Sequence, residues 1–281
     1  MQGGKWLTTA TLKPMINEPA LILSSKNLNV LCIADVHVGY EIALGQAGFR
    51  VPSQTVKLIE KIYDLTRKVN AKKLIILGDV KHGVSMFRRE LQECAFFLTE
   101  VSSFVDVEVV RGNHDFNIEK VLPKNVILHG SKGVLIQECN VALIHGHAWP
   151  KPELLHAEQI VMGHNHPVVE FRDVSGARWL KPVWVETQLD RMKVALRLGK
   201  KQLFINGLIN ILVVPAFNPL LGGVPINVNT ELLGPLLSSK MINVDETSLT
   251  LLDATYLGKL SELKKCFEGF SYGEHLQSPK S

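Results

Sequence analysis

Short apolar runs that each end in a polar loop recur along the first 170 residues of the chain. Runs at 20–24 and 28–34 predict two strands, and runs at 72–77 and 105–110 predict two more. Apolar residues at helical spacing predict helices over 53–69, with Ser53 as the N-cap, and over 87–101. Because strands and helices alternate, we expect a βαβαβ core with a parallel sheet.

The second half of the chain predicts shorter strands, at 126–128, 134–137, 141–144, 159–162, 168–171 and 178–180. From 191 to 198 apolar residues alternate with polar ones, which predicts a half-buried strand whose exposed face carries Arg191, Lys193 and Arg197. More strand is expected within 203–214, and no periodicity places the stretch 215–223. We expect one domain over 1–260, with a motif-bearing core at 20–170 and a sheet-completing part at 171–260, followed by a short helix and frayed tail over 261–281.

Composition narrows the class of protein. With 46% hydrophobic and 21% charged residues, the chain can bury a substantial core and is not disordered by composition. A net charge of +4 and a pI near 8.8 permit contact with a polyanion but fall short of a dedicated DNA-binding module. The four cysteines form no Cys-x-x-Cys pair, so we expect reduced, mostly buried thiols. No signal-peptide pattern or unbroken apolar span is present, which predicts a cytoplasmic protein without membrane contact.

The chemistry is concentrated in five polar clusters that follow apolar runs. Six of the ten histidines lie in four of these clusters, whereas core histidines have no reason to gather at strand ends. Carboxylates, one asparagine and several imidazoles form a mixed ligand set that suits manganese, iron or zinc better than calcium. The clusters are Asp35-Val36-His37, Gly78-Asp79, Gly112-Asn113-His114-Asp115, His145-Gly146-His147 and Gly163-His164-Asn165-His166.

The order of these five motifs, from residue 35 to residue 166, resembles the calcineurin-like metallophosphoesterase superfamily. The sequences at 78–82 and 215–223 also resemble those of archaeal SbcD-related and ligase-associated phosphoesterases. This resemblance implies a four-layer α/β/β/α sandwich of two mixed β-sheets flanked by helices. It also implies two divalent metal ions, with manganese the first choice and iron, zinc or nickel as alternatives.

The resemblance also assigns roles to individual residues. One metal would be held by Asp35, His37 and His166, and the second by Asn113, His145 and His164, with Asp79 bridging them. His114 would be the catalytic histidine beside the scissile group, and Asp115 would orient it. Candidates for substrate binding are His147, Arg50, Arg111 and His82, although each also has an ordinary structural explanation.

The function that we predict is hydrolysis of a phosphodiester by in-line attack of a metal-bridging hydroxide. Nucleic acid is one candidate substrate. A phosphomonoesterase acting on a nucleotide or phosphoprotein is one alternative, and an inactive scaffold with the same fold is another. Recruitment to DNA or to DNA-repair machinery through the basic residues at 191–197 would add to the first function. Only 29 positions, residues 116–144, separate the third motif from the fourth, and no DNA-capping domain is visible, which argues against a SbcD-type exonuclease.

Overall fold

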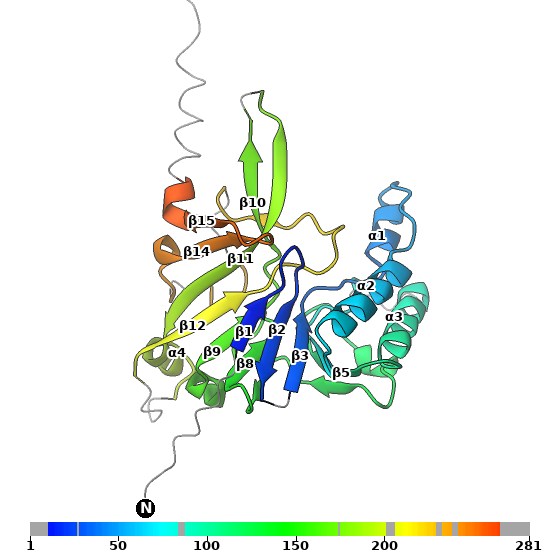
Figure 1. Cartoon of the computed structure of the whole chain (residues 1–281), viewed down its shortest axis with the longest axis horizontal. Helices are drawn as coiled ribbons and strands as arrows, with labels where there is room; N and C mark the ends of the chain where they lie inside the picture. The colour runs from blue at the N-terminus through cyan, green and yellow to red at the C-terminus, as the bar shows by residue number, and fades with distance from the viewer. Residues whose placement is uncertain are drawn as a thin grey trace, which may run out of the picture.

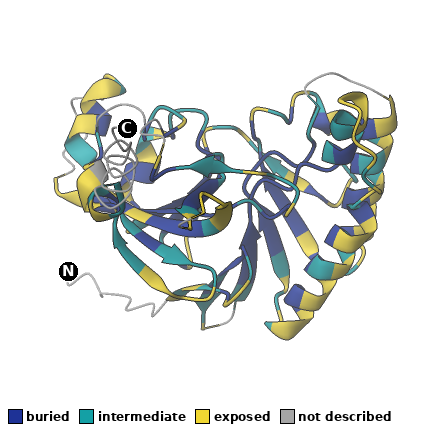
Figure 2. Ribbon diagram, turned by 90° about the horizontal axis from the view of Figure 1, so that it is seen from above, coloured by how far each residue is buried: buried dark blue, intermediate teal, exposed yellow. Residues whose placement is uncertain are grey.

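Two β-sheets packed face to face form the centre of the protein (Figure 1). The computed structural model describes residues 11–26, 28–83, 88–173, 175–200, 206–228, 232–237 and 241–264. Helices cover the outer face of each sheet, and Figure 2 shows buried residues on the strands between them. The predicted α/β/β/α arrangement of two mixed sheets flanked by helices is therefore confirmed.

The first sheet has the strand order β1-β2-β3-β4-β5-β6. Its strands β3 to β6 run parallel, while β1, β2 and β3 pair antiparallel. The strands are β1 (Thr11–Pro14), β2 (Leu21–Ser25), β3 (Leu28–Ile33), β4 (Lys73–Ile76), β5 (Asp106–Val110) and β6 (Ile127–His129). The accompanying helices are α1 (Tyr40–Gln46), α2 (Thr55–Lys68) and α3 (Arg88–Val101), and a 3-10 turn, η1 (Ile118–Lys120), follows β5.

Strand β3 explains why this sheet is covered on both faces. Leu31 and Ile33 pack into the cluster under α2 and α3, while Val30 and Cys32 pack into the cluster shared with the second sheet. Successive side chains of a strand point to opposite faces, so a continuous apolar run serves two cores at once. The predicted N-cap of α2 is displaced by one residue, because Gln54 occupies that position.

The second sheet has the order β13-β10-β11-β12-β9-β8-β7, with β14 paired to β11 and β15 paired to β14. It consists of β7 (Val134–Ile136), β8 (Val141–Ile144), β9 (Gln159–Met162), β10 (Pro167–Arg172), β11 (Arg178–Asp190), β12 (Leu208–Val213), β13 (Val224–Pro225), β14 (Ser248–Leu251) and β15 (Tyr256–Lys259). Helix α4 (Arg191–Arg197) and the 3-10 turns η2 (Pro152–His156) and η3 (Val244–Glu246) complete the elements. Strands β10 and β11 extend beyond the sheet as a projecting hairpin (Figure 1).

The prediction of a strand over 191–198 is wrong, because residues Arg191–Arg197 form α4. The Asp190 carboxylate caps this helix by accepting a hydrogen bond from the Lys193 backbone N–H. Val194 and Ala195 are buried, whereas Leu196 is exposed, so the buried positions follow a helical face rather than strand alternation. Ala195 would lie on the exposed face of a strand, so its burial departs from the alternation.

Further predictions concern the cysteines, the stretch 215–223 and the end of the chain. Cys32, Cys94 and Cys139 are buried free thiols as predicted. The stretch 215–223 joins β12 to β13 without a helix or strand of its own. Residues 201–205, Cys266 and the tail from 265 onward lie outside the described residues. Within the described part of the chain, no helix combines the length and the apolar character needed to cross a membrane.

Candidate metal centre

The loops that follow β3, β4, β5, β8 and β9 converge at one edge of the two sheets. Backbone hydrogen bonds tie the first two loops together, from Asp35 N to the Gly78 carbonyl at 3.2 Å and from His37 N to the Asp79 carbonyl at 2.8 Å. The Gly163 N–H donates to the His145 carbonyl at 3.0 Å, which joins the fourth and fifth loops. Carboxyl ends of neighbouring parallel strands meet at one edge, so this convergence follows from the topology.

Left-handed backbone conformations bring the side chains of these loops inward. Non-glycine residues rarely adopt positive φ, and doing so costs free energy that the surrounding structure must supply. Here five residues of the predicted ligand set have positive φ: Asp35 (56°), His37 (44°), Asp79 (50°), His164 (72°) and His166 (41°). Such strain gathered at one place is typical of a functional site.

Two glycines permit the loops to approach this closely. A Cβ on Gly78 would lie 2.4 Å from His145 Nδ1, and Gly78 itself has a φ of +79°. A Cβ on Gly112 would lie 2.1 Å from Asp79 Oδ1. Any larger residue at either position would push a predicted ligand out of place.

The first group of possible ligands consists of Asp35, His37 and His166, whose ligand atoms lie within 4.8 Å of one another. Asp35 Oδ1 and His166 Nε2 are 3.1 Å apart, yet neither forms a hydrogen bond, and His37 Nε2 is also a buried atom without a hydrogen-bond partner. Unsatisfied buried polar atoms are costly and rare. A divalent cation among these three atoms would satisfy all of them, so the residues present fit a metal ion.

The second group consists of Asp79, His145 and His164, again with ligand atoms within 4.8 Å of one another. His145 Nε2 lies 3.3 Å from Asp79 Oδ2 and 3.1 Å from the side-chain oxygen of Asn113. Asp79 Oδ2 also lies 3.5 Å from His37 Nε2, which belongs to the first group. The Asp79 carboxylate therefore stands between the two groups, where a bridging ligand is needed.

Electrostatics at the centre favour positive charge. Burial alone would raise the pKa of Asp35, but His166, His145 and His37 outweigh burial and lower it. Burial would lower the pKa of His145, but Asp79 and Asp35 raise it to about 9. The structure thus places a proton on His145 beside two ionised carboxylates, where a metal ion would otherwise balance their charge.

Two other imidazoles of the ligand set, those of His37 and His164, keep their lone pairs available. Burial lowers the pKa of His37 to about 3 and, together with His145, the pKa of His164 to about 4. Both rings are therefore neutral near pH 7, which is the form that binds metal.

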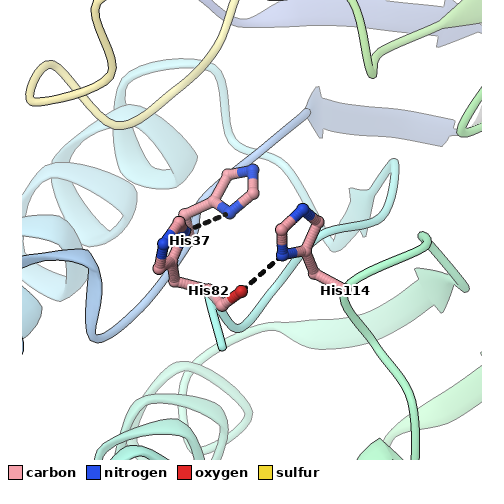
Figure 3. A group of neighbouring side chains, drawn as sticks. All are labelled: His37, His82 and His114. Carbon is pink, nitrogen blue, oxygen red and sulfur yellow. Dashed lines mark hydrogen bonds between the residues drawn. The ribbon is translucent and has the colours of Figure 1, made fainter. Parts of the chain in front are cut away.

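Figure 3 shows His37, His82 and His114 gathered at one side of the centre. His82 Nδ1 lies 3.2 Å from His37 Nδ1, and the His114 Nδ1–H donates to the His82 carbonyl. Because Nδ1 of His37 is engaged by His82, its Nε2 remains the nitrogen directed at the carboxylates. His82, which stays a predicted substrate-binding residue, contacts a predicted metal ligand.

Asp115, which was predicted to orient the His114 imidazole, forms its side-chain hydrogen bonds with backbone groups. The fully buried Asp115 carboxylate accepts backbone N–H bonds from Val80 at 2.9 Å, Lys81 at 3.4 Å and Gly112 at 2.8 Å. Asp115 thereby holds the second and third loops together. The His114 imidazole is oriented by the His82 carbonyl, which accepts a hydrogen bond from its Nδ1–H. Backbone donors at tight turns compete strongly for a nearby carboxylate.

The other substrate-binding candidates divide into two kinds. His147 packs beside the centre, with its ring 5.2 Å from that of His145 and 6.1 Å from that of His164. Arg111 instead forms an ion pair with Glu119 at 2.8 Å. Arg50 lines a separate hollow together with Phe49 and Arg89. Neither arginine contacts the centre within the described part of the chain.

Two buried asparagines and one lysine that support the centre were not predicted in these roles. Asn165 exchanges side-chain hydrogen bonds with the Leu233 backbone, and Asn218 donates to the Val36 and His37 carbonyls. Lys81 is buried and donates to the Gly83 and His114 carbonyls rather than facing a phosphate. Only the position of Asn165 between two histidines gave any local signal.

A model of the calcineurin-like phosphoesterase superfamily domain matches residues 28–185, which is more than half of the chain and contains all five motifs. The chain belongs to this superfamily. The prediction of a metal-dependent phosphoesterase is thereby confirmed, and the His/Asp groups described above are able to hold its metal.

Several solved structures resemble this calcineurin-like phosphoesterase. The nuclease MPE of Pseudomonas putida is 19% identical, with a TM-score of 0.48, and the match covers 87% of this chain and 97% of that one. The Escherichia coli phosphoesterase Yfce is 18% identical, with a TM-score of 0.36, and the match covers 82% of this chain and 97% of that one. No curated protein matches the chain.

Proposed function

We propose that the protein is a phosphodiesterase that uses two divalent metal ions, with manganese as the first choice. Asp35, His37 and His166 would hold one ion, and Asn113, His145 and His164 the other, with Asp79 between them. The observation that carries this proposal is the pair of three-residue groups, one of which contains the buried Asp79 carboxylate that also lies 3.5 Å from His37 of the other. When bound, two such ions lower the pKa of a water molecule and offset charge on the phosphoryl oxygens.

In this proposal His114 serves the reacting phosphate directly. Its Nδ1–H donates to the His82 carbonyl, which leaves Nε2 as the free nitrogen, 4.0 Å from Asp79 Oδ2. The side chain is 27% exposed, so a substrate can reach it. In our proposal the doubly protonated ring gives its Nε2 proton to the departing oxygen and is left neutral, with Nδ1–H still on the His82 carbonyl, while the backbone N–H of His114 orients Asp79 through a 2.8 Å hydrogen bond.

The surroundings of the centre favour a diester over a monoester. A monoester carries more negative charge than a diester and is commonly bound by arginine forks. In the described part of the chain neither predicted arginine contacts the centre, and Lys81 is occupied by carbonyls. The resemblance to SbcD-related phosphoesterases further favours a nucleotide or nucleic acid as the source of the diester.

Recruitment to DNA through the basic residues at 191–197 stays a prediction, now for a helix. Arg191 already donates to the Leu208 and Leu155 carbonyls, so it also supports the fold. Lys193 and Arg197 are exposed on α4 and are the residues to test by charge removal. Weakened, salt-sensitive DNA binding in that variant would support recruitment.

A comparison of bis-p-nitrophenyl phosphate with p-nitrophenyl phosphate, in the presence of Mn²⁺, tests the function. We expect faster turnover of the diester and a loss of about 10³-fold or more in kcat in Asp79→Asn. The exposed Asp64→Asn, on α2, is the matched control and should leave kcat unchanged. Faster turnover of the monoester would support the phosphomonoesterase, and a chain that binds two ions without hydrolysing either ester would be a scaffold.

A further inference from the structure

A hollow of about 310 Å³ adjoins the metal centre beside His166. His166 lines this hollow and also belongs to the first group of possible metal ligands. The walls come from the base of the β10–β11 hairpin and from the stretch 216–223, which the sequence could not place. We name it the His166 hollow.

The walls of the His166 hollow are largely apolar, and His166 and Asn218 are the polar side chains among them. Among the described residues that line it, none is lysine, arginine, aspartate or glutamate. A second phosphate would find no lysine or arginine there, and a charged group away from His166 would lose its hydration without a charged partner. An uncharged organic group is therefore the occupant that the walls suit, and the volume is at the lower end of small-molecule sites. The apolar wall residues are Pro167, Val168, Leu180, Pro182, Pro219 and Leu221.

The hollow is held at a fixed place relative to His166. Val168 pairs with Pro182 across the hairpin, and Leu180 lies two residues along the same face of β11. The Val224 N–H donates to the His166 carbonyl at 3.0 Å. A Cβ on Gly223 would lie 2.4 Å from Val168 Cγ1 and 2.6 Å from the His166 carbonyl oxygen, so only glycine allows this contact. A group bound in the hollow would therefore be positioned by the same segment, at the start of β10, that presents the predicted metal ligand His166.

We propose that the His166 hollow binds the nucleobase of a nucleotide ester whose phosphate lies at the metal centre. This inference rests on the proposed phosphodiesterase function and names its substrate class. Prolines and Leu180 offer flat apolar contacts to the faces of a base, and Leu180 is 43% exposed and available to be covered. Gly222 and Gly223 also line the hollow, and among the described residues their N–H groups donate to no backbone carbonyl.

Two diesters with the same leaving group test the proposal: thymidine 5′-(p-nitrophenyl phosphate) and methyl p-nitrophenyl phosphate. The thymidine ester should have a KM lower by about tenfold, because only it fills the hollow. Leu180→Ala should raise that KM by about fivefold and leave the KM of the methyl ester unchanged. Leu196→Ala, which removes another exposed leucine on α4, is the matched control and should change neither KM.

A binding measurement separates this proposal from the proposed function. Thymidine added to the metal-free protein should shift the NMR methyl signals of Leu180 and leave those of Leu196 in place. If neither ester is hydrolysed but thymidine produces this shift, the phosphodiesterase fails and the base-binding hollow stands. Equal KM values for the two esters, or no thymidine-dependent shift at Leu180, would overturn the hollow even in an active diesterase.

Discussion

Asn218 donates a hydrogen bond from Nδ2 to the carbonyl of Val36 at 2.9 Å, joining positions 182 residues apart in the sequence. The same Nδ2 lies 3.4 Å from the His37 carbonyl, and the neighbouring Phe217 N–H donates to the Ala34 carbonyl at 2.8 Å. Asn218 is only 1% exposed. The C-terminal part of the chain therefore fixes the backbone that presents Asp35 and His37.

Asn218→Ala should weaken manganese binding by about tenfold, because groups that hold the ligands in place contribute that much to affinity. Manganese content after dialysis at a defined free concentration measures the effect. Asn210→Ala is the matched control, since Asn210 is an exposed asparagine on β12 whose side chain accepts a hydrogen bond from Gln188, away from the metal centre. If the Asn218 variant retains as much metal as the control, the support that we infer from this hydrogen bond is absent.

His82→Ala should lower occupancy of the first metal group, because His82 Nδ1 contacts His37 Nδ1 and fixes the orientation of that ring. We expect bound manganese to fall from about two ions toward one per chain when free metal is limiting. His129→Ala removes a histidine that pairs with Glu108 instead, and should leave the stoichiometry unchanged. An undiminished metal content in His82→Ala would mean that His37 needs no such partner.

Asp115→Ala should destabilise the fold as well as the site. It leaves three buried backbone N–H groups without an acceptor, which we expect to lower the free energy of unfolding by about 3 kcal/mol. Urea unfolding of the metal-free protein measures this cost without any contribution from bound ions. Asp106→Ala, at the exposed start of β5, should cost little. A stable Asp115 variant that loses only activity would instead favour the orienting role first predicted for this residue.

Metal affinity should rise with pH between about pH 6.5 and pH 9. Burial opposes protonation of His145, but Asp79 and Asp35 raise its pKa to about 9, so the ring carries a proton in the metal-free protein near neutrality. That proton must leave before the ring can bind an ion, so affinity increases by about tenfold per pH unit until the pKa is reached. Calorimetry in two buffers of different ionisation enthalpy should report about one proton released per ion bound at the second group. Binding without proton release would contradict a protonated His145 that loses its proton to become a ligand.

The sequence predicted which residues meet at the metal centre wherever those residues directly follow a strand. Asp35, Asp79 and His145 each follow a run of buried residues, and neighbouring parallel strands bring such positions to a common edge. The contacts that hold the loops were not predictable. Asn218 reaches the first loop from the far end of the chain, and a turn asparagine followed by proline has no local feature that distinguishes this role.

The pattern of apolar and polar residues also gave the wrong secondary structure for a short helix that depends on a single capping residue. Residues 191–197 contain alternating apolar and basic positions, and only the Asp190 cap and the burial of Ala195 reveal a helix. Strands β14 and β15 went unpredicted because Ser248–Leu251 and Tyr256–Lys259 are too short to establish a period. Both pair at the edge of the second sheet, where tertiary contacts rather than propensity decide the structure.

The most direct test of the account is a crystal structure of the protein grown with Mn²⁺, with anomalous diffraction used to locate the metal. We predict two anomalous peaks, one among Asp35, His37 and His166 and the other among Asn113, His145 and His164, with the Asp79 carboxylate contacting both. A single peak that Asp79 does not contact, or no peak at the edge where these loops meet, would contradict the proposed two-metal centre.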